Sequence, residues 1–205
     1  MLTLYYSDNL NPRLCVAAAR YLEAPVRYQA AAPLAPGNAE AFAPLNPNLR
    51  VPVLAGDDGP SLWETDAIVC QLSRRCGRTD FFPDGELLPE MLRWLSWSAM
   101  HWGQACSGFY FQHLVVPRYG LAPLSDSVMA GHAAELKRLA PILDAHLAQR
   151  RWMLGDTLTY ADFRVGAALP FAQQARIDLS AYPAISRWAG QLAQIPAWAN
   201  PFEGL

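Results

Sequence analysis

Residues 48–68, with the sequence NLRVPVLAGDDGPSLWETDAI, decide the fold of the first half of this chain. Residues 51–54 have the apolar composition of a short strand, and their proline fits the start of that strand because proline cannot donate to a sheet ladder. Residues 57–59, Asp-Asp-Gly, predict a hairpin turn, and residues 62–63 predict a short return strand. Residues 64–66 then begin a helix. The stretch therefore predicts a hairpin followed by a helix.

The residues before this stretch predict a strand, a helix and a second strand. The apolar and aromatic run 2–6 fits a buried strand. Asn11, which precedes a proline, predicts the N-cap of a helix that stops near Ala24. Residues 26–29 alternate like a strand, and residues 38–43 predict one helical turn. The predicted order of elements in the first half is therefore β-α-β-α-β-β-α.

The second half of the chain predicts helices only. From Leu87 onward, apolar residues recur at spacings of three and four. Thr159 and Asp162 match a capping box ahead of an apolar helix that extends to about Ala175, and we expect this pair to have a structural role. The predicted fold class is α/β plus all-α. It consists of an α/β domain over residues 1–77, a linker over residues 78–86 and an all-helical domain over residues 87–205.

The composition excludes several classes of protein. The chain has 205 residues, of which 52% are hydrophobic and 17% are charged, so it is not a disordered polypeptide. This apolar excess indicates extra buried surface such as a dimer interface. The net charge of −2 argues against a dedicated nucleic-acid-binding protein. We expect no signal peptide and no membrane span, because the N-terminal run lacks a basic region and polar residues interrupt each apolar run.

The cysteines do not form a metal or disulfide motif. None of the four belongs to a Cys-x-x-Cys pair, and no histidine lies beside them at the spacing of a zinc site. We therefore expect no metal. The cysteines fit small buried side chains in a reducing cytoplasm.

Three motifs carry a resemblance to a known family. They are residues 48–54, NLRVPVL; residues 62–68, LWETDAI; and residues 158–163, LTYADF. With these motifs in this order, the chain resembles the cytosolic glutathione transferases, in particular bacterial members, and the class within the family stays open. The resemblance implies an N-terminal thioredoxin-like domain, a C-terminal helical domain, a cytoplasmic homodimer, a role in detoxification and glutathione as the co-substrate.

The resemblance also implies where glutathione binds. Pro52 would follow a cis peptide bond, and the main chain of Val51, next to Arg50, would then pair with the cysteinyl unit of glutathione. Thr65 stands where the family has a serine that caps a helix and binds the γ-glutamyl carboxylate. A helix N-terminus suits a carboxylate because its N–H groups are unpaired and its dipole end is positive. Glu64 would bind the ammonium group.

The residue that activates the glutathione thiol is left open by the sequence. An ordinary thiol has a pKa of about 8.5 and is mostly protonated at neutral pH, so a hydrogen-bond donor must favour the thiolate. Ser7 follows the first predicted strand, whereas bacterial relatives with the same Tyr-Tyr-Ser sequence have a cysteine a few residues later. Serine-type members of the family carry the activating serine a few residues before an arginine that matches Arg13, and this resemblance points instead to Asn9 or Asn11. Tyr6 is a further candidate.

The resemblance places the electrophile beside the first long helix, where Trp102, Tyr110 and His101 are the candidate lining residues. The first functional hypothesis is a glutathione-dependent enzyme. It would conjugate the glutathione thiolate to small hydrophobic electrophiles or use it in thiol-dependent reduction. The alternative is a non-catalytic binding or scaffold protein, because the sequence Asn11-Pro12-Arg13 is loosely similar to the transferase-like domain of an elongation factor subunit. Neither hypothesis involves a nucleic acid, a membrane or a metal.

Overall fold

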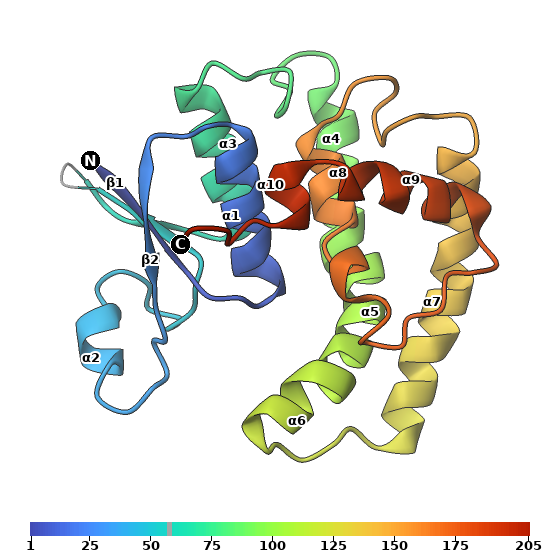
Figure 1. Ribbon diagram of the computed structural model, residues 1–205, viewed down its shortest axis with the longest axis horizontal. Coiled ribbons are helices and arrows are strands. Elements are labelled where there is room, and N and C mark those ends of the chain that lie inside the picture. Colours follow the sequence, from blue (N-terminus) through green and yellow to red (C-terminus); the bar gives the residue numbers. More distant parts are fainter. Residues whose placement is uncertain (57–58) are drawn as a thin grey trace. The chain divides into compact units, whose positions relative to one another are not determined.

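The computed structural model describes residues 1–56 and 59–205, and its elements are shown in Figure 1. The chain forms two compact units. The first consists of Met1–Phe82 together with Ile195–Leu205, and the second is Pro83–Gln194. The boundary between Phe82 and Pro83 falls inside the predicted linker. The C-terminal residues, which the sequence grouped with the helical domain, belong to the first unit. Two residues of the predicted hairpin turn, Asp57 and Asp58, lie outside the described residues.

The first unit contains a four-stranded sheet that confirms the predicted strands. Its strands are β1 (Leu2–Tyr6), β2 (Val26–Ala30), β3 (Val53–Ala55) and β4 (Leu62–Trp63), and their spatial order is β2-β1-β3-β4. β1 is parallel to β2, and β3 is antiparallel to both β1 and β4. Pro52 immediately precedes β3 and does not interrupt a ladder, as expected for a residue that cannot donate.

Four helices belong to the part of the first unit that the structure describes. They are α1 (Leu10–Tyr21), α2 (Ala39–Phe42), α3 (Thr65–Arg75) and α10 (Pro196–Ala199). α1 and α3 pack side by side, and α2 lies apart from them (Figure 1). The interior between the sheet and these two helices is apolar. Its members include Leu4, Val16, Val53 and Ile68, each with 0% exposure, and burial of such side chains is the main force that holds the layers together.

The predicted start of α1 was wrong. The N-cap is Asn9, not Asn11, and the helix ends at Tyr21. Pro12 therefore lies in the first turn and not at the first helical position. This position still tolerates proline, because the N–H groups of the first turn have no partner within the helix.

The second unit is helical, as predicted. Its residues, all of which the structure describes, form six α-helices, two single-turn π-helical segments and one 3₁₀ turn. In order these are α4 (Leu88–Trp97), η1 (Ser98–Trp102), α5 (Gly103–Tyr110), η2 (Phe111–Val115), α6 (Val116–Tyr119), α7 (Asp126–Leu147), α8 (Tyr160–Val165), η3 (Leu169–Phe171) and α9 (Pro183–Ala193). Within residues 1–56 and 59–205, every helix is too short or too polar to span a bilayer.

The helix predicted to reach Ala175 was wrong, because α8 ends at Val165. Gly166 is the C-cap residue, and a 3₁₀ turn follows at Leu169–Phe171. Pro170 explains the break. It has no N–H to donate, and in a continuing α-helix its ring would clash with the carbonyl group of Gly166.

The capping box around Asp162 is confirmed as a structural feature of the second unit. The Asp162 carboxylate has 0% exposure. It accepts hydrogen bonds from Met153 N–H (2.7 Å), Thr159 N–H (3.0 Å) and Trp188 Nε1 (2.9 Å). Burial nevertheless raises the pKa of Asp162 to about 6, because desolvation of the charged form outweighs these hydrogen bonds. The carboxylate thus joins three segments of the second unit.

The predicted burial of the cysteines holds for two of the four. Cys15 and Cys106 are buried, and Cys70 and Cys76 are partly exposed. Burial raises the pKa of Cys106 to about 12.

Candidate functional site

The sheet register brings three candidate segments to one end of the first unit. Tyr5 in β1 pairs with Val53 in β3, and Val53 pairs with Trp63 in β4. Ser7 lies two residues after Tyr5, Val51 two residues before Val53, and Thr65 two residues after Trp63. Tyr5, Val53 and Trp63 thus form a row across the three strands. Because β3 is antiparallel to both neighbours, Ser7, Val51 and Thr65 all lie on the same side of this row. Adjacent strands are about 4.8 Å apart, so the three segments are neighbours in space.

The middle segment offers an open backbone position at Val51. The Val51–Pro52 peptide bond is cis. No described residue forms a hydrogen bond with the main-chain N–H or C=O of Val51, which precedes the sheet ladder. The loop before it is fixed, because the buried Asn46 side chain donates to Arg50 C=O (2.9 Å) and accepts from Asn48 N–H (3.0 Å). The result is an ordered backbone donor and acceptor at the start of β3, at one end of the sheet.

The third segment is the N-terminus of α3. Thr65 is the first residue of the helix and is only 5% exposed, whereas Glu64 is exposed. Glu64 has a φ of 72°, a backbone conformation that strains non-glycine residues and is common at functional sites. Its carbonyl group accepts from Ile68 N–H at 3.0 Å, so the N–H groups of residues 65–67 come before the first helical hydrogen bond. This end of α3 therefore suits an anion.

The first segment is the turn between β1 and α1. Asn9 Nδ2 donates to Ser7 Oγ at 3.2 Å. Since the Ser7 oxygen is the acceptor here, its own O–H proton remains available, and among the described residues Ser7 donates to none. Asn11 is exposed in the first turn of α1. Of the four candidates for thiol activation, Ser7 and Asn9 are thus brought together.

Tyr6, the fourth candidate, is an aromatic packing residue. Its ring stacks on Phe202, with centroids 5.6 Å apart and planes inclined by 16°. It also meets the edge of Tyr28 on β2, at 6.5 Å. This placement argues against direct activation of a thiol by Tyr6.

Sequence reasoning missed the residues of the C-terminal segment. Arg13 is only 6% exposed, and its Nη2 donates to the carbonyl oxygen of Trp198. The guanidinium also lies over the Trp198 ring, 5.1 Å from its centroid. Burial lowers the pKa of Arg13 to about 10. The two aromatic residues within 195–205 were the sequence signal that this segment is buried. Periodicity does not show, however, that Arg13, so distant along the chain, is its partner.

The predicted electrophile residues lie in the second unit, and their placement corrects the prediction for Trp102. Trp102 is 1% exposed, and its Nε1 donates to Val165 C=O at 2.9 Å, so it is a core residue and cannot line an open pocket. Tyr110 is 8% exposed and packs edge-to-face on Phe171, at 5.1 Å. His101 is exposed.

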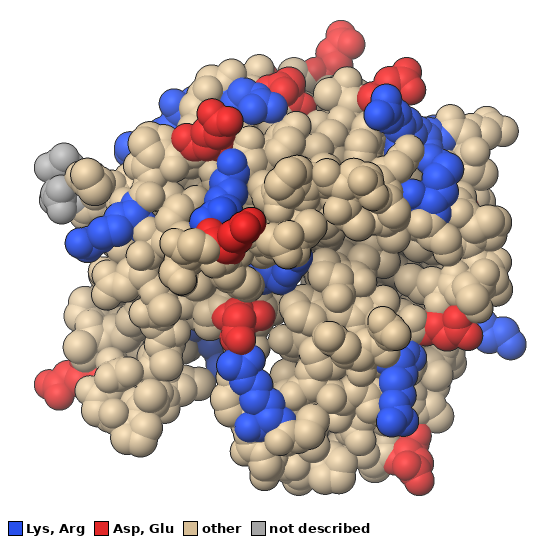
Figure 2. Space-filling view, viewed as in Figure 1, with Lys and Arg blue, Asp and Glu red and all other residues tan. Residues whose placement is uncertain are grey.

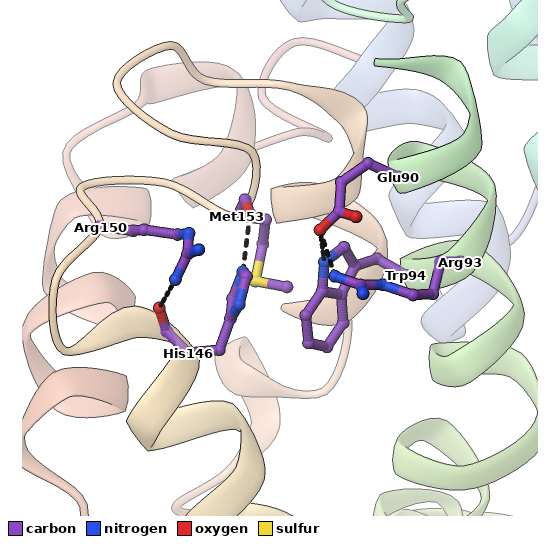
Figure 3. A network of polar contacts seen from close by, with 6 residues as sticks. All are labelled: Glu90, Arg93, Trp94, His146, Arg150 and Met153. Carbon is purple, nitrogen blue, oxygen red and sulfur yellow. Dashed lines mark hydrogen bonds and ion pairs between the residues drawn. The ribbon is translucent and has the colours of Figure 1, made fainter. Parts of the chain in front are cut away.

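A second aromatic and polar cluster in the same unit is structural (Figure 3). The His146 ring lies 4.3 Å from the Trp94 ring, and its Nε2 is 2.8 Å from Met153 O. Trp94 Nε1 donates to Glu90 at 3.0 Å, and Glu90 also pairs with Arg93. Burial is the main cause of the lowered pKa of His146, which favours the neutral ring. These contacts join α4 to the end of α7.

The residues that the structure describes offer no candidate metal cluster, and the face shown in Figure 2 is not dominated by one charge. Residues 1–56 and 59–205 hold no group of three or more His, Cys, Asp or Glu side chains that could bind a metal ion. Basic and acidic side chains are interspersed on the face shown in Figure 2. A cavity of about 630 Å³ in the first unit lies at the opposite end of the strands, where its lining includes Leu2, Arg75 and Cys76. The candidate residues do not line it.

Comparisons with known proteins agree with this architecture. Residues 126–190 match the sequence profile of the glutathione S-transferase C-terminal domain. Glutathione S-transferase 3 of Zea mays is 31% identical over 163 residues, which cover 77% of this chain and 72% of that protein. The chain therefore belongs to the glutathione S-transferase family of enzymes.

Two further similarities bear on the fold and on the range of relatives. A solved structure of glutathione S-transferase I bound to lactoylglutathione superposes with a TM-score of 0.87 at 21% identity, covering 98% of this chain and 97% of that one. This similarity supports the fold, with a thioredoxin-like first unit and a helical second unit. Elongation factor 1-gamma of Equus caballus is 27% identical over 194 residues, which cover 91% of this chain but only 43% of that protein.

Proposed function

We propose that this protein is a glutathione transferase that joins the glutathione thiolate to small apolar electrophiles. The observation that carries the proposal is the meeting of Ser7, the Val51 main chain and the N-terminus of α3 beyond the row Tyr5–Val53–Trp63. In the reaction, the thiol loses its proton to solvent and the sulfur lone pair forms a bond to an electrophilic carbon. In a substitution, the leaving group departs with the electrons of its bond to that carbon. In an addition to an activated double bond, the π electrons move to the neighbouring carbon, which then takes a proton from solvent.

Glutathione is an extended tripeptide, and each part has a matching group in the first unit. The N–H and C=O of Val51 would pair with the cysteinyl unit as a short strand addition, with Arg50 beside it. Thr65 and the first turn of α3 would bind the γ-glutamyl carboxylate. The exposed Glu64 carboxylate would bind the ammonium group.

Ser7 is the proposed thiol-activating residue, and Asn9 supports it. The Asn9 amide occupies a lone pair of Ser7 Oγ, which leaves the hydroxyl proton for the thiolate. A hydrogen bond to a charged group contributes about 1.5–3 kcal/mol, which lowers a thiol pKa by about one to two pH units. The same thiolate would serve thiol-dependent reduction of a substrate. The absence of a cysteine from residues 7–14 argues against a mechanism that uses an enzyme thiolate at this turn.

Calorimetric titration with glutathione at pH 7 tests the proposal. We expect the wild type to bind in the micromolar to low-millimolar range, and Thr65→Ala to weaken binding about tenfold, the equivalent of one charge-assisted hydrogen bond. Thr79→Ala is the matched control, because Thr79 is an exposed threonine of the same unit away from the row. Absence of heat in the wild type at ten times the expected dissociation constant would contradict the proposal.

The second candidate function is a non-catalytic binding or scaffold module. The similarity to elongation factor 1-gamma over 91% of this chain favours it. A scaffold has no physical need for an open Val51 main chain beside a helix N-terminus, and we therefore rank it second. Glutathione binding without turnover of any electrophile would support it.

We also propose that the protein acts as a cytoplasmic homodimer. The family and the 52% hydrophobic composition support an additional buried surface. Light scattering at micromolar concentration measures the mass directly, and a mass of 22.6 kDa, that of one chain, would contradict the dimer.

A further inference from the structure

The C-terminal segment Ile195–Leu205 holds the β1–α1 turn from both sides. Before the turn, Phe202 stacks on Tyr6, which is adjacent to Ser7. After the turn, the Trp198 carbonyl and ring hold the Arg13 guanidinium. Ser7 and Asn9 lie between these two contacts in the chain.

The contact after the turn is buried. Trp198 is 3% exposed and Arg13 is 6% exposed, so neither side chain can rotate into solvent without losing its partner. The main-chain N–H of Arg13 donates to Asn9 C=O at 2.9 Å, which is the first helical hydrogen bond of α1. Arg13 is therefore hydrogen-bonded to Asn9, the residue whose side chain donates to Ser7.

The contact before the turn is aromatic. Tyr6 lies between Phe202 and Tyr28, and the Arg20 guanidinium lies over Tyr28, 5.9 Å from the ring centroid. Arg20 Nη2 also donates to the carbonyl oxygen of Glu203. The chain end is thus anchored to α1 at a second point, which limits the motion of Phe202 away from Tyr6.

We propose that Trp198 and Phe202 are positioning residues for Ser7, so that the last eleven residues of the chain, Ile195–Leu205, set how well the turn activates the glutathione thiol. This inference rests on the proposed function. Its physical basis is that a hydrogen bond weakens steeply as its angle departs from linearity, so a loosened turn leaves Ser7 in place on average but oriented for only part of the time. Neither residue touches the reacting sulfur.

Two measurements on Phe202→Leu test the proposal. The first is hydrogen–deuterium exchange of residues 7–13 without glutathione, where we expect faster exchange. The second is the pH dependence of thiolate absorbance for bound glutathione, where we expect the apparent pKa of the thiol to rise by about half a pH unit, or up to about threefold less thiolate at neutral pH. Phe202→Tyr keeps the stacked ring and should restore both values.

Phe42→Leu is the matched control. Phe42 also makes a ring contact with β1, edge-to-face on Tyr5 at 5.8 Å, one residue further from the turn than Tyr6. We expect it to lower stability without changing exchange in residues 7–13 or the thiol pKa. Unchanged exchange in Phe202→Leu relative to this control would overturn the proposal.

A loosened turn with an unchanged thiol pKa would equally overturn it, because the segment would then be structural only. The exchange measurement needs no glutathione. A wild type that failed to bind glutathione would therefore contradict the proposed function and leave the exchange result to decide the positioning role.

Discussion

The end of the sheet in the first unit and the Asp162 centre in the second unit use hydrogen bonds in opposite ways. Asp162 is fully buried, and donors from three segments satisfy its oxygens. At the sheet end, the Val51 main chain and the Ser7 hydroxyl proton have no partner among the described residues. Saturated polar groups stabilise a fold, and ordered but unsaturated ones are available to a ligand. The contrast separates a structural centre from a binding site.

The largest effect is expected from Asp162→Ala. The substitution leaves the buried donors of Met153, Thr159 and Trp188 without an acceptor, and each such loss costs about 1–3 kcal/mol. We expect the free energy of unfolding to fall by about 3 kcal/mol or more in urea denaturation. Asp178→Ala, at an exposed aspartate of the same unit, is the control. If the free energy of unfolding fell by less than about 1 kcal/mol, Asp162 would not be the structural centre that we contrast with the sheet end.

The structural role of Asp162 can also be tested by the pH dependence of stability. Burial raises the folded-state pKa of Asp162 from 3.8 to about 6, so the folded protein binds a proton more tightly than the unfolded chain does. The stability due to this proton is fully present below pH 3.8 and is lost as the pH rises through about 6.

Asp162→Asn removes this titration. The difference in unfolding free energy between the wild type and Asp162→Asn should therefore shrink by roughly 1–3 kcal/mol between pH 4 and pH 6, in favour of the variant at the higher pH. Denaturation series at several pH values measure it. A difference that grows with pH would show that the carboxylate is stabilised in the fold.

Ser7→Ala tests the other side of the contrast. We expect the apparent thiol pKa to rise by about one pH unit and kcat/KM at pH 7 to fall about tenfold, with a change in stability below about 0.5 kcal/mol. Ser180→Ala, at an exposed serine of the second unit, is the control. Full activity in Ser7→Ala would move the assignment to Asn9 or Asn11.

The smallest effect on the glutathione site is expected from Trp102→Phe. This change removes the hydrogen bond to Val165 C=O and should lower stability by about 1–2 kcal/mol. Glutathione affinity should not change, because Trp102 belongs to the core of the second unit. A changed selectivity among electrophiles at equal stability would return Trp102 to the substrate pocket.

Local patterns predicted most of the secondary structure. The strands of residues 2–6 and 62–63 and the capping box at Thr159 depend on neighbouring residues, so the sequence displays them directly. The errors arose where two local signals competed. Asn9 and Asn11 are both suitable N-cap residues within three positions of the same proline, and the apolar pattern after Tyr160 continues beyond the point where Gly166 and Pro170 end the helix.

The site was only partly predictable for a different reason. Two of the motifs located Val51 and Thr65, and Ser7 was located by the end of the first predicted strand, but only the pairing of Tyr5, Val53 and Trp63 brings them to one end of the sheet. The aromatic residues expected to line a pocket were misjudged at Trp102, because spacing along a helix does not tell a core face from a pocket face.

The sequence by itself determined the order of elements, the family and the chemical groups at the candidate site, because each is written in short stretches of adjacent residues. Tertiary structure decided which polar groups are saturated and which are open, and it decided that Trp198 and Phe202 pack on the first unit. These outcomes depend on contacts between residues nearly two hundred positions apart, such as Arg13 and Trp198 with a separation of 185. Burial and register select such contacts, and no local pattern encodes them.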